Sequence, residues 1–334
     1  MKRSFGTKLY LLRRRIEVSP ISKRGKASLR SKLLNVHVAG LVFKNPTVLA
    51  SGVLGYSAES LQRMAEAGAG AVVTKSVGLI PRVGYSNPTV VQADCGLVNA
   101  MGLPNSGIMN YAYEIWLAKP VLSVPLIVSV YGFSGEDFAV VAQKAAEAGA
   151  DALELNVSCP HVSGTGSEIG QNPKLVKVAV SKVKARVQVP VFVKLSPNVT
   201  DVVEIAEAAV EGGADALTAV NTVRAMAINV ETGRPILSNK RGGLSGSAVK
   251  PIALRCIYDI FEKVKVPIIG CGGVANWRDA VEFLLAGASA VQVGTAIAVE
   301  GPSVFKEINE GIKVYLRKRK LRSVQEIVGL SHRS

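Results

Sequence analysis

The segment "EAGADALELNVS" (residues 147–158) decides the fold, because its pattern occurs three more times along the chain. Each copy reads as the end of a helix, a glycine-containing turn and a short apolar strand. The other copies are "EAGAGAVVTKS" (66–76), "EGGADALTAVNT" (211–222) and "LAGASAVQVGTA" (285–296). Near-continuous apolar strands that alternate with helices predict a parallel sheet whose faces are covered by those helices.

A second pattern, Val-Pro before an apolar run, marks further strand starts, since proline suits the first residue of a strand. Together these patterns predict eight strands, at 47–52, 71–76, 125–131, 152–158, 190–196, 216–222, 267–271 and 290–295. Helical patterns lie between most of them, at 57–68, 136–149, 173–186, 200–213, 248–264, 276–287 and 301–318. The interval 77–124 is longer and less regular.

Eight such units favour an α/β fold of the (β/α)8 type, the TIM barrel, with its active site at the C-terminal ends of the strands. The alternative is an open doubly wound sheet. It is disfavoured because no G-x-G-x-x-G motif follows the first predicted strand.

The net charge of +15 is concentrated at the two ends of the 334-residue chain. Residues 1–33 hold eleven Lys/Arg and one acid, Glu17, and residues 313–322 hold six more bases. We therefore expect three parts: a basic N-terminal extension at 1–32, disordered or the product of a start codon assigned too early; a barrel at 33–312; and a basic, solvated tail at 313–334. Nucleic-acid binding by the ends is the alternative. It predicts interleaved aromatic residues, and the basic clusters contain only Phe5, Tyr10 and Tyr315.

The four cysteines form no C-x-x-C pair. This spacing predicts neither a disulfide framework nor a metal site, and it favours a reduced, cytoplasmic setting. Cys271 is expected to serve only in packing. No apolar run approaches the ~18–20 residues that a membrane span needs.

Polar side chains are predicted at the C-terminal ends of several apolar strands. Lys75, Asn156 and Asn221 occupy matching places in three copies of the repeat, and Lys194 ends another strand. Because buried polar groups are costly without a partner, these residues predict a site that takes a polar ligand. Glycine-rich turns at "GCGGV" (270–274) and "VGTA" (293–296) follow the last two strands, where this fold commonly binds phosphate.

Several motifs occur in an order that is similar to the class 1 dihydroorotate dehydrogenases. They are "ASG" (50–52), "TKS" (74–76), "NAMGLPN" (99–105), "ELNVSCP" (154–160), "VKLSPN" (193–198), "NT" (221–222), "GGLSG" (242–246), "GCGG" (270–273) and "VGTA" (293–296). The resemblance covers roughly residues 33–312. The stretch from 220 to 246 resembles the catalytic subunit of the subclass, class 1B, that passes electrons to a separate iron–sulfur flavoprotein.

This resemblance implies an FMN-dependent oxidoreductase that converts (S)-dihydroorotate to orotate in de novo pyrimidine biosynthesis. It further implies a homodimeric core, a partner subunit with FAD and an iron–sulfur cluster, and NAD+ as the final acceptor. Cys159 is then the catalytic base. The implied FMN-binding residues are Ser51, Lys75, Ser76, Asn156, Lys194, Val220, Gly246, Gly272, Gly273, Gly294 and Thr295. The implied substrate-binding residues are Lys75, Asn99, Ala100, Met101, Gly102, Leu103, Asn156, Asn221 and Thr222.

Two positions depart from the family pattern, and two related functions stay open. His161 stands where the family has an Asn that contacts substrate, and Ser129 stands where relatives often have an Asn near the flavin. One alternative is an enzyme that resembles dihydropyrimidine dehydrogenase and acts on another pyrimidine. The other is the same reaction with a different electron acceptor, such as fumarate.

Overall fold

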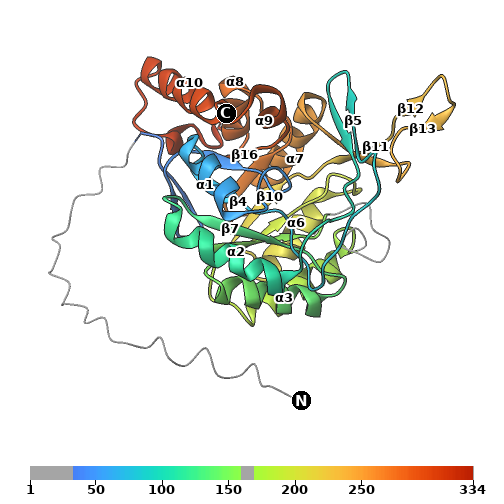
Figure 1. Ribbon diagram of the computed structural model, residues 1–334. Coiled ribbons are helices and arrows are strands. Elements are labelled where there is room, and N and C mark those ends of the chain that lie inside the picture. The colour runs from blue at the N-terminus through green and yellow to red at the C-terminus, as the bar shows by residue number, and fades with distance from the viewer. Residues whose placement is uncertain (1–32, 159–168, 334) are drawn as a thin grey trace. The chain divides into compact units, whose positions relative to one another are not determined.

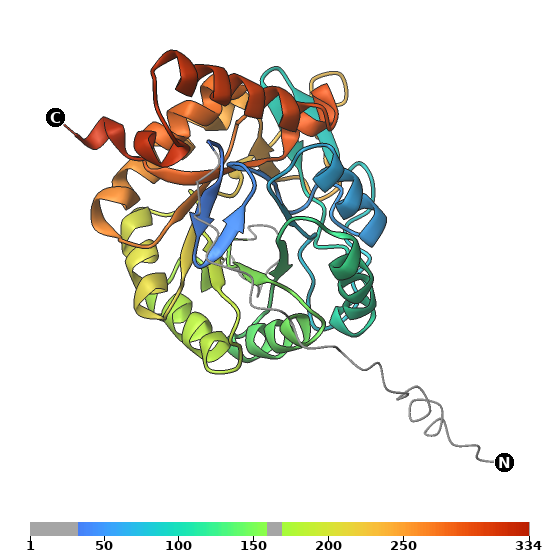
Figure 2. The same cartoon turned by 90° about the vertical axis from the view of Figure 1, so that its left-hand side faces the viewer.

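The computed structural model describes residues 33–158 and 169–333. Eight parallel strands close into a barrel in the order β3-β4-β7-β8-β9-β10-β15-β16, and helices surround it (Figure 2). The predicted (β/α)8 fold is confirmed. The barrel strands are β3 (Thr47–Leu49), β4 (Ala71–Val73), β7 (Leu126–Val130), β8 (Ala152–Asn156), β9 (Val191–Lys194), β10 (Ala216–Ala219), β15 (Ile268–Cys271) and β16 (Ala288–Val293).

Most strands are shorter than predicted, because the chain leaves the barrel at the polar residues. After β4, for example, the backbone N–H of Lys75 donates to the carbonyl of Gly55, at 2.7 Å, rather than to a neighbouring strand. Of the polar residues that the sequence assigns to strand ends, Lys75 and Asn221 therefore lie in the turns that follow β4 and β10. Asn156 and Lys194 are the last residues of β8 and β9.

The helices around the barrel are α1 (Ala58–Glu66), α2 (Ile108–Val121), α3 (Gly135–Glu147), α5 (Pro173–Lys184), α6 (Val202–Glu211), α7 (Lys250–Lys263), α8 (Trp277–Leu285), α9 (Thr295–Glu300) and α10 (Val304–Lys318). Side chains cap several of their N-termini. Asn276 and Asp279 form a capping box on α8, and Ser57 and Ser60 form one on α1. Such caps satisfy backbone N–H groups that have no partner inside the helix.

A glycine of the sequence repeat follows four of these helices: α1, α3, α6 and α8. Gly68, Gly149, Gly213 and Gly287 have φ angles of 112°, 113°, 100° and 117°. Side-chain-bearing residues rarely adopt these angles, so glycine is favoured where the chain turns from helix to strand. The sequence repeat therefore arises because the same backbone turn, from helix to strand, occurs at all four places.

Residues 77–124 hold several of the elements that the sequence pattern missed. They contain β5 (Val90–Ala93), β6 (Gly96–Asn99) and α2. In α2, Ile108 and Ile115 are buried while Met109 and Trp116 are exposed, so apolar residues occur on both sides of the helix. The helix therefore lacks the one-sided apolar pattern by which sequence analysis recognises a surface helix.

A second, antiparallel sheet lies outside the barrel. Its strand order is β11-β14-β6-β5, with β11 at Val223–Ala225 and β14 at Gly242–Ser245. Beyond it a short hairpin of β12 (Ile228–Asn229) and β13 (Arg234–Pro235) projects from the molecule (Figure 1). The pairing of β6 with β14 joins residues that are far apart in the sequence, which is why local patterns did not predict it.

The opposite end of the barrel is covered by a hairpin of β1 (Val36–Val38) and β2 (Leu41–Phe43), which crosses the barrel axis in Figure 2. Val36, Val38 and Phe43 are buried. Because this hairpin covers the N-terminal end of the strands, a ligand can reach the barrel only from the C-terminal end of the strands. This is the end at which we expect the active site.

The boundary expected at residue 313 falls inside α10. Leu316, Val324 and Ile327 are fully buried, and the short helices η2 (Val324–Ile327) and η3 (Leu330–His332) follow α10. Residues 313–333 therefore pack on the barrel and do not form a solvated tail. The expectation failed because Arg317 and Lys318 lie on the exposed face of α10, opposite its apolar residues. The expected N-terminal extension, 1–32, lies outside the described residues.

Within the part of the chain that the structure describes, none of the helices has the length and apolar character needed to cross a bilayer.

The packing of α10 gives a direct test. Leu316→Ala should lower the free energy of unfolding by about 2–5 kcal/mol, because it leaves a cavity in a fully buried site. Urea unfolding followed by circular dichroism measures this change. Lys318→Ala, on the exposed face of the same helix, is the control and should change stability by less than about 0.5 kcal/mol. Equal, small effects of both substitutions would mean that the segment does not pack as described.

Candidate active site

A hydrogen-bonded cluster joins the C-terminal ends of four neighbouring strands. Its centre is the Ser76 hydroxyl, just after β4. This hydroxyl lies 3.3 Å from the Ser51 hydroxyl and 2.8 Å from the Ser129 hydroxyl of β7, and it accepts a 3.0 Å hydrogen bond from Asn156 Nδ2 at the end of β8. Three of the predicted site residues, Ser51, Ser76 and Asn156, are therefore in direct contact. Ser129, noted as a departure from the family pattern, belongs to the same cluster.

The cluster continues to the residue that precedes Cys159. Asn156 Oδ1 accepts hydrogen bonds from the Ser158 hydroxyl, at 2.9 Å, and from the Ser158 backbone N–H, at 3.3 Å. Asn221 Nδ2 donates to the same hydroxyl at 2.7 Å. Two predicted asparagines thus fix the chain at residue 158. Cys159 and His161 themselves lie outside the described residues.

Asn198 organises the next turn, although the sequence analysis gave it no role. Its Nδ2 donates to the Thr222 carbonyl at 2.9 Å, and its Oδ1 accepts from the Arg224 N–H at 2.8 Å. The Thr222 N–H in turn donates to Asn221 Oδ1 at 2.9 Å. The position of Asn198 at the end of the "VKLSPN" motif was the available signal.

Lys75 provides a positive charge beside this cluster. The side chain is half-buried, and burial lowers the pKa of its ammonium group. No carboxylate in residues 33–158 or 169–333 forms an ion pair with it. A partly desolvated cation without an acidic partner fits a site that receives an anionic ligand, because such a ligand compensates the lost hydration.

Lys194 lies inside the barrel in a polar network that the sequence analysis did not predict. Its Nζ donates to Gln292 Oε1 at 2.9 Å and lies 3.8 Å from Glu154 Oε1. Gln292 Nε2 donates to Glu154 Oε2 at 2.5 Å, and the Thr218 hydroxyl donates to the same oxygen at 2.9 Å. All four residues are buried.

The repeat contained a signal for this network. Glu154, Thr218 and Gln292 each stand two residues after the shared alanine of the repeat, at Ala152, Ala216 and Ala290. Residues at the same place in parallel barrel strands form layers inside the barrel. The equivalent residue in the first copy is Val73, so the polar character of the layer is not shared by all copies.

Burial and charge act in opposite directions on Lys194. Burial disfavours its charge, but attraction by Cys271 and by Glu154 raises the pKa of the ammonium group. Burial also raises the pKa of the Cys271 thiol, against the effect of Lys194. Cys271 therefore influences the charge of Lys194, in addition to the packing role expected from the sequence.

The predicted glycines form a tight backbone cradle. A Cβ on Gly273 would lie 2.8 Å from the carbonyl oxygen of Gly246, and a Cβ on Gly272 would lie 3.0 Å from Ala253 Cβ. Gly246, Gly272 and Gly273 have φ angles of 105°, 125° and 82°. Gly294 directly precedes Thr295, the first residue of α9. These turns present backbone rather than side chains, which suits a phosphate group.

Two further parts of the predicted FMN and substrate sites adjoin this cradle. The Val220 N–H donates to the Cys271 carbonyl at 2.8 Å, which ties the end of β10 to β15. Of the predicted residues Asn99 to Leu103, Asn99 ends β6 in the antiparallel sheet and the other four lie in the loop that follows it. None of them belongs to the cluster around Asn156. Asn99 Nδ2 donates to the Gly243 carbonyl at 3.3 Å. This sheet is tied to the barrel mouth because β11 begins after Thr222 and β14 ends before Gly246.

The loop after Asn99 has an unusual backbone. Gly102 and Leu103 have φ angles of 74° and 57°, while Ala100 is buried and Met101 is 38% exposed. The loop is held by Asn105, whose Nδ2 donates to the Tyr131 hydroxyl at 2.8 Å and to the Leu103 carbonyl at 2.8 Å. Asn105 was part of a quoted motif but was not assigned to the site.

Comparison with known proteins identifies the family. A family model described as "Dihydroorotate dehydrogenase" matches residues 33–316. The chain belongs to the dihydroorotate dehydrogenase family. Members of this family are flavin-dependent oxidoreductases that act on a CH–CH bond.

Similar proteins from archaea carry one common name. The chain is 51% identical over 297 residues to "Dihydroorotate dehydrogenase B (NAD(+)), catalytic subunit" of Methanosarcina acetivorans, covering 89% of this chain and 95% of that one. It is 52% identical over 299 residues to the protein of the same name from Pyrococcus abyssi, covering 90% and 99%. The resemblance to class 1B catalytic subunits is therefore confirmed.

A solved structure supports the fold. The crystal structure of a dihydroorotate dehydrogenase from Eimeria tenella in complex with ferulenol superposes with a TM-score of 0.79 and 24% identity, covering 95% of this chain and 92% of that one. This likeness confirms the barrel fold of the dihydroorotate dehydrogenase family.

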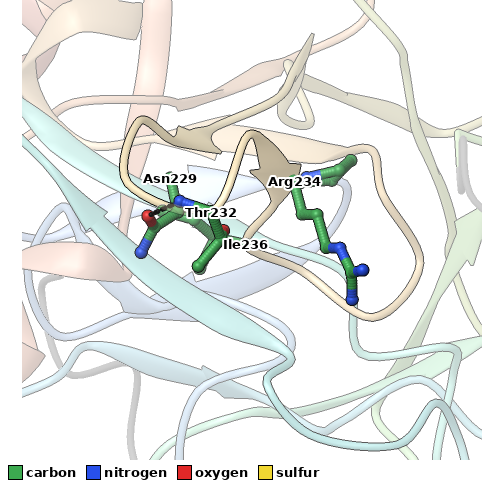
Figure 3. A pocket seen from close by; sticks show the side chains of 5 residues that line it. Asn229, Thr232, Arg234 and Ile236 are labelled. Carbon is green, nitrogen blue, oxygen red and sulfur yellow. Dashed lines mark hydrogen bonds between the residues drawn. The ribbon is translucent and has the colours of Figure 1, made fainter.

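A hollow elsewhere on the molecule is separate from this site. It has a volume of about 550 Å³ and lies beside the β12–β13 hairpin, where the Thr232 N–H donates to Asn229 Oδ1 at 3.0 Å (Figure 3). Asn229, Thr232, Arg234, Pro235 and Ile236 line it, and none of them is a predicted site residue.

Ser76 is the most connected member of the cluster, and its removal tests the described geometry. Ser76→Ala leaves Asn156 Nδ2 without its acceptor in a buried place, so the free energy of unfolding should fall by about 1–3 kcal/mol. Denaturant unfolding measures this loss, and the exposed Ser106→Ala is the matched control. A Ser76→Ala protein as stable as the control would contradict the hydrogen-bonded cluster.

Proposed function

We propose that the protein oxidises (S)-dihydroorotate to orotate in pyrimidine biosynthesis, with FMN as its flavin. The observation that carries this proposal is the buried cluster of Ser76, Asn156, Ser158 and Asn221, which holds the chain directly before Cys159. The comparisons also support the proposal, because about half of the residues of this chain are identical to those of the catalytic subunits named above.

The residues around the barrel mouth suit a pyrimidine carboxylate. Amide side chains offer both a donor and an acceptor, which match the alternating C=O and N–H groups of the ring, and we assign this role to Asn99, Asn156 and Asn221. Lys75 would pair with the carboxylate, since its partly buried charge has no acidic partner among the described residues. The remaining proposed substrate contacts are Ala100, Met101, Gly102, Leu103 and Thr222.

Bound FMN would supply the two-electron oxidising chemistry, with a hydride leaving C6 of the substrate. The backbone cradle of Gly246, Gly272, Gly273, Gly294 and Thr295 would hold its phosphate, and Lys194 would lie at the flavin edge where negative charge grows on reduction. The other proposed FMN contacts are Ser51, Lys75, Ser76, Asn156 and Val220.

Cys159 would act as the general base. Its Sγ takes the proton from C5 while the C6 hydride leaves, which gives the C5=C6 double bond of orotate. A thiol with an ordinary pKa of ~8.5 suits this task near neutral pH if its surroundings favour the thiolate. The bonds that Asn156 and Asn221 make to Ser158 would set the place from which Cys159 reaches the substrate.

Electrons would leave through another protein. The archaeal relatives are named as NAD(+)-linked catalytic subunits, which implies a separate electron-transfer subunit. We propose that this partner carries FAD and an iron–sulfur cluster, with NAD+ as the final acceptor, and that two copies of the present chain form the core of the complex.

The first test concerns cofactor and electron exit. The purified chain should release about one FMN per chain on denaturation, and anaerobic dihydroorotate should bleach its visible flavin band. The isolated chain should reduce artificial dyes but not NAD+, because the route to NAD+ runs through the partner. FAD as the sole flavin would overturn the cofactor assignment, and rapid NAD+ reduction by this chain alone would overturn the partner assignment.

The second test concerns the base. Cys159→Ala should keep FMN and bind orotate, but flavin reduction by dihydroorotate should slow by about 10²–10⁴-fold, equivalent to ~3–5 kcal/mol of barrier. Anaerobic stopped-flow absorbance measures this rate. Cys256→Ala is the matched control, since burial in α7 raises the pKa of this thiol to about 11 and keeps it protonated. A normal rate in Cys159→Ala would show that another group removes the proton.

A further inference from the structure

A buried carboxylate inside the barrel has no role in the reaction as proposed above. Glu154 lies on β8 and is fully buried. Its Oε2 accepts hydrogen bonds from the Thr218 hydroxyl, at 2.9 Å, and from Gln292 Nε2, at 2.5 Å. Its Oε1 accepts no hydrogen bond from the described residues and lies 3.8 Å from Lys194 Nζ.

Both groups that contact Oε2 of Glu154 are hydrogen-bond donors. A carboxylate oxygen accepts hydrogen bonds only, so two donors suit it. A buried charge also needs a counterion, and the ammonium of Lys194 is the opposite charge at this place. The pair is therefore best described as a carboxylate and an ammonium, with no net charge.

Gln292 connects the two charges. Because Glu154 can only accept, the Gln292 amide must turn its Nε2 toward the carboxylate, and its Oε1 then faces Lys194. Lys194 Nζ donates to that oxygen at 2.9 Å. The carboxylate thus orients the amide, and the amide holds the ammonium group in one place.

We propose that Glu154 is a positioning residue that keeps Lys194 protonated and aimed at its ligand, acting by direct attraction and through the Gln292 amide. The proposal deepens the proposed function, since it rests on Lys194 facing the flavin. An ammonium paired in this way offers a hydrogen bond to a developing negative charge while the pair as a whole stays neutral.

Among the described residues, two titratable groups act on Lys194: Glu154 from β8 and Cys271 from β15. Burial disfavours the lysine charge, and attraction by these two groups raises the lysine pKa. Burial raises the pKa of the Cys271 thiol, and a protonated thiol carries no charge, so Cys271 attracts Lys194 only where it has ionised, and Glu154 is the carboxylate beside the ammonium group. A group with a raised pKa is protonated below that pKa and loses its proton above it, so Lys194 keeps its charge throughout the neutral range.

The near-isosteric change Glu154→Gln removes the negative charge beside Lys194, while Lys194 stays buried. A buried lysine without a counterion has a lowered pKa, because desolvation then acts alone. Lys194 should therefore lose its proton as the pH rises through the neutral range. The comparison is best made in a Cys271→Ala background, so that a thiolate cannot replace the missing carboxylate.

The test is a titration of Lys194 by NMR. The full-length chain is labelled with ¹³C at the lysine ε carbons, and the Lys194 signal is assigned by its absence in Lys194→Met. Between about pH 6 and about pH 9, this signal should not titrate in Cys271→Ala, and it should titrate in Cys271→Ala/Glu154→Gln. The same flat profile in both proteins would overturn the proposal.

A double substitution keeps the proposal testable if Glu154→Gln does not fold. Removing one member of a buried pair is far more destabilising than removing both. Glu154→Gln/Lys194→Met should therefore fold and be more stable than Glu154→Gln alone in urea unfolding. If the double variant also failed to fold, Glu154 would have a structural role that is independent of Lys194, and the proposal would be wrong.

A second readout links the pair to the flavin without using dihydroorotate. The midpoint potential of bound FMN, measured by reductive titration with dithionite, should show an additional pH-dependent step in Cys271→Ala/Glu154→Gln that is absent from Cys271→Ala. An unchanged profile despite a titrating Lys194 would overturn the claim that the pair faces the flavin. Failure of the proposed function would look different: FMN would be missing, or dihydroorotate would not reduce it, while the NMR titration would still report on Lys194.

Discussion

The parallel pairing of β16 with β3 closes the sheet, and the rest of the molecule depends on this closure. Gln292 of the last strand lies beside Val48 of the first. Once the ring is closed, all eight strands end at the same rim, so residues from distant parts of the sequence converge there. Ser51 and Asn221 could not otherwise belong to one hydrogen-bonded cluster.

Closure also creates the interior of the barrel. Most of this interior is filled by apolar side chains, and one layer of it is filled by polar side chains. Glu154, Lys194, Thr218 and Gln292 are buried together among Val and Leu residues. Such a group is costly to desolvate, and its members offset that cost only by satisfying one another. Above this layer, the Ser76 and Asn156 cluster satisfies itself in the same way while it holds the chain before Cys159. These two hydrogen-bonded networks explain how polar side chains can be buried at the C-terminal end of an otherwise apolar barrel.

The antiparallel sheet and the loop after Asn99 complete the mouth from outside the barrel. Their connections run through Thr222 and Gly246, which are themselves at strand ends. Asn105 and Asn198 fix the two loops through side-chain bonds to backbone groups. The parts of the site that belong to no barrel strand are therefore still positioned by it. Family membership agrees with this arrangement, since the matched residues, 33–316, include both the barrel and the sheet.

The sequence by itself determined the barrel and most of the proposed site, because both depend on local signals that repeat. The glycine at the end of each repeat, such as Gly149, marks a turn of fixed geometry, and polar residues such as Lys75 and Asn156 stand out in apolar strands. Tertiary structure alone decided the rest. The pairing of β6 with β14, the packing of Leu316 beneath a basic helix surface and the contact of Glu154 with Gln292 all join residues that no local pattern relates. Their physical basis is burial and long-range pairing, which exist only once the ring of strands has closed.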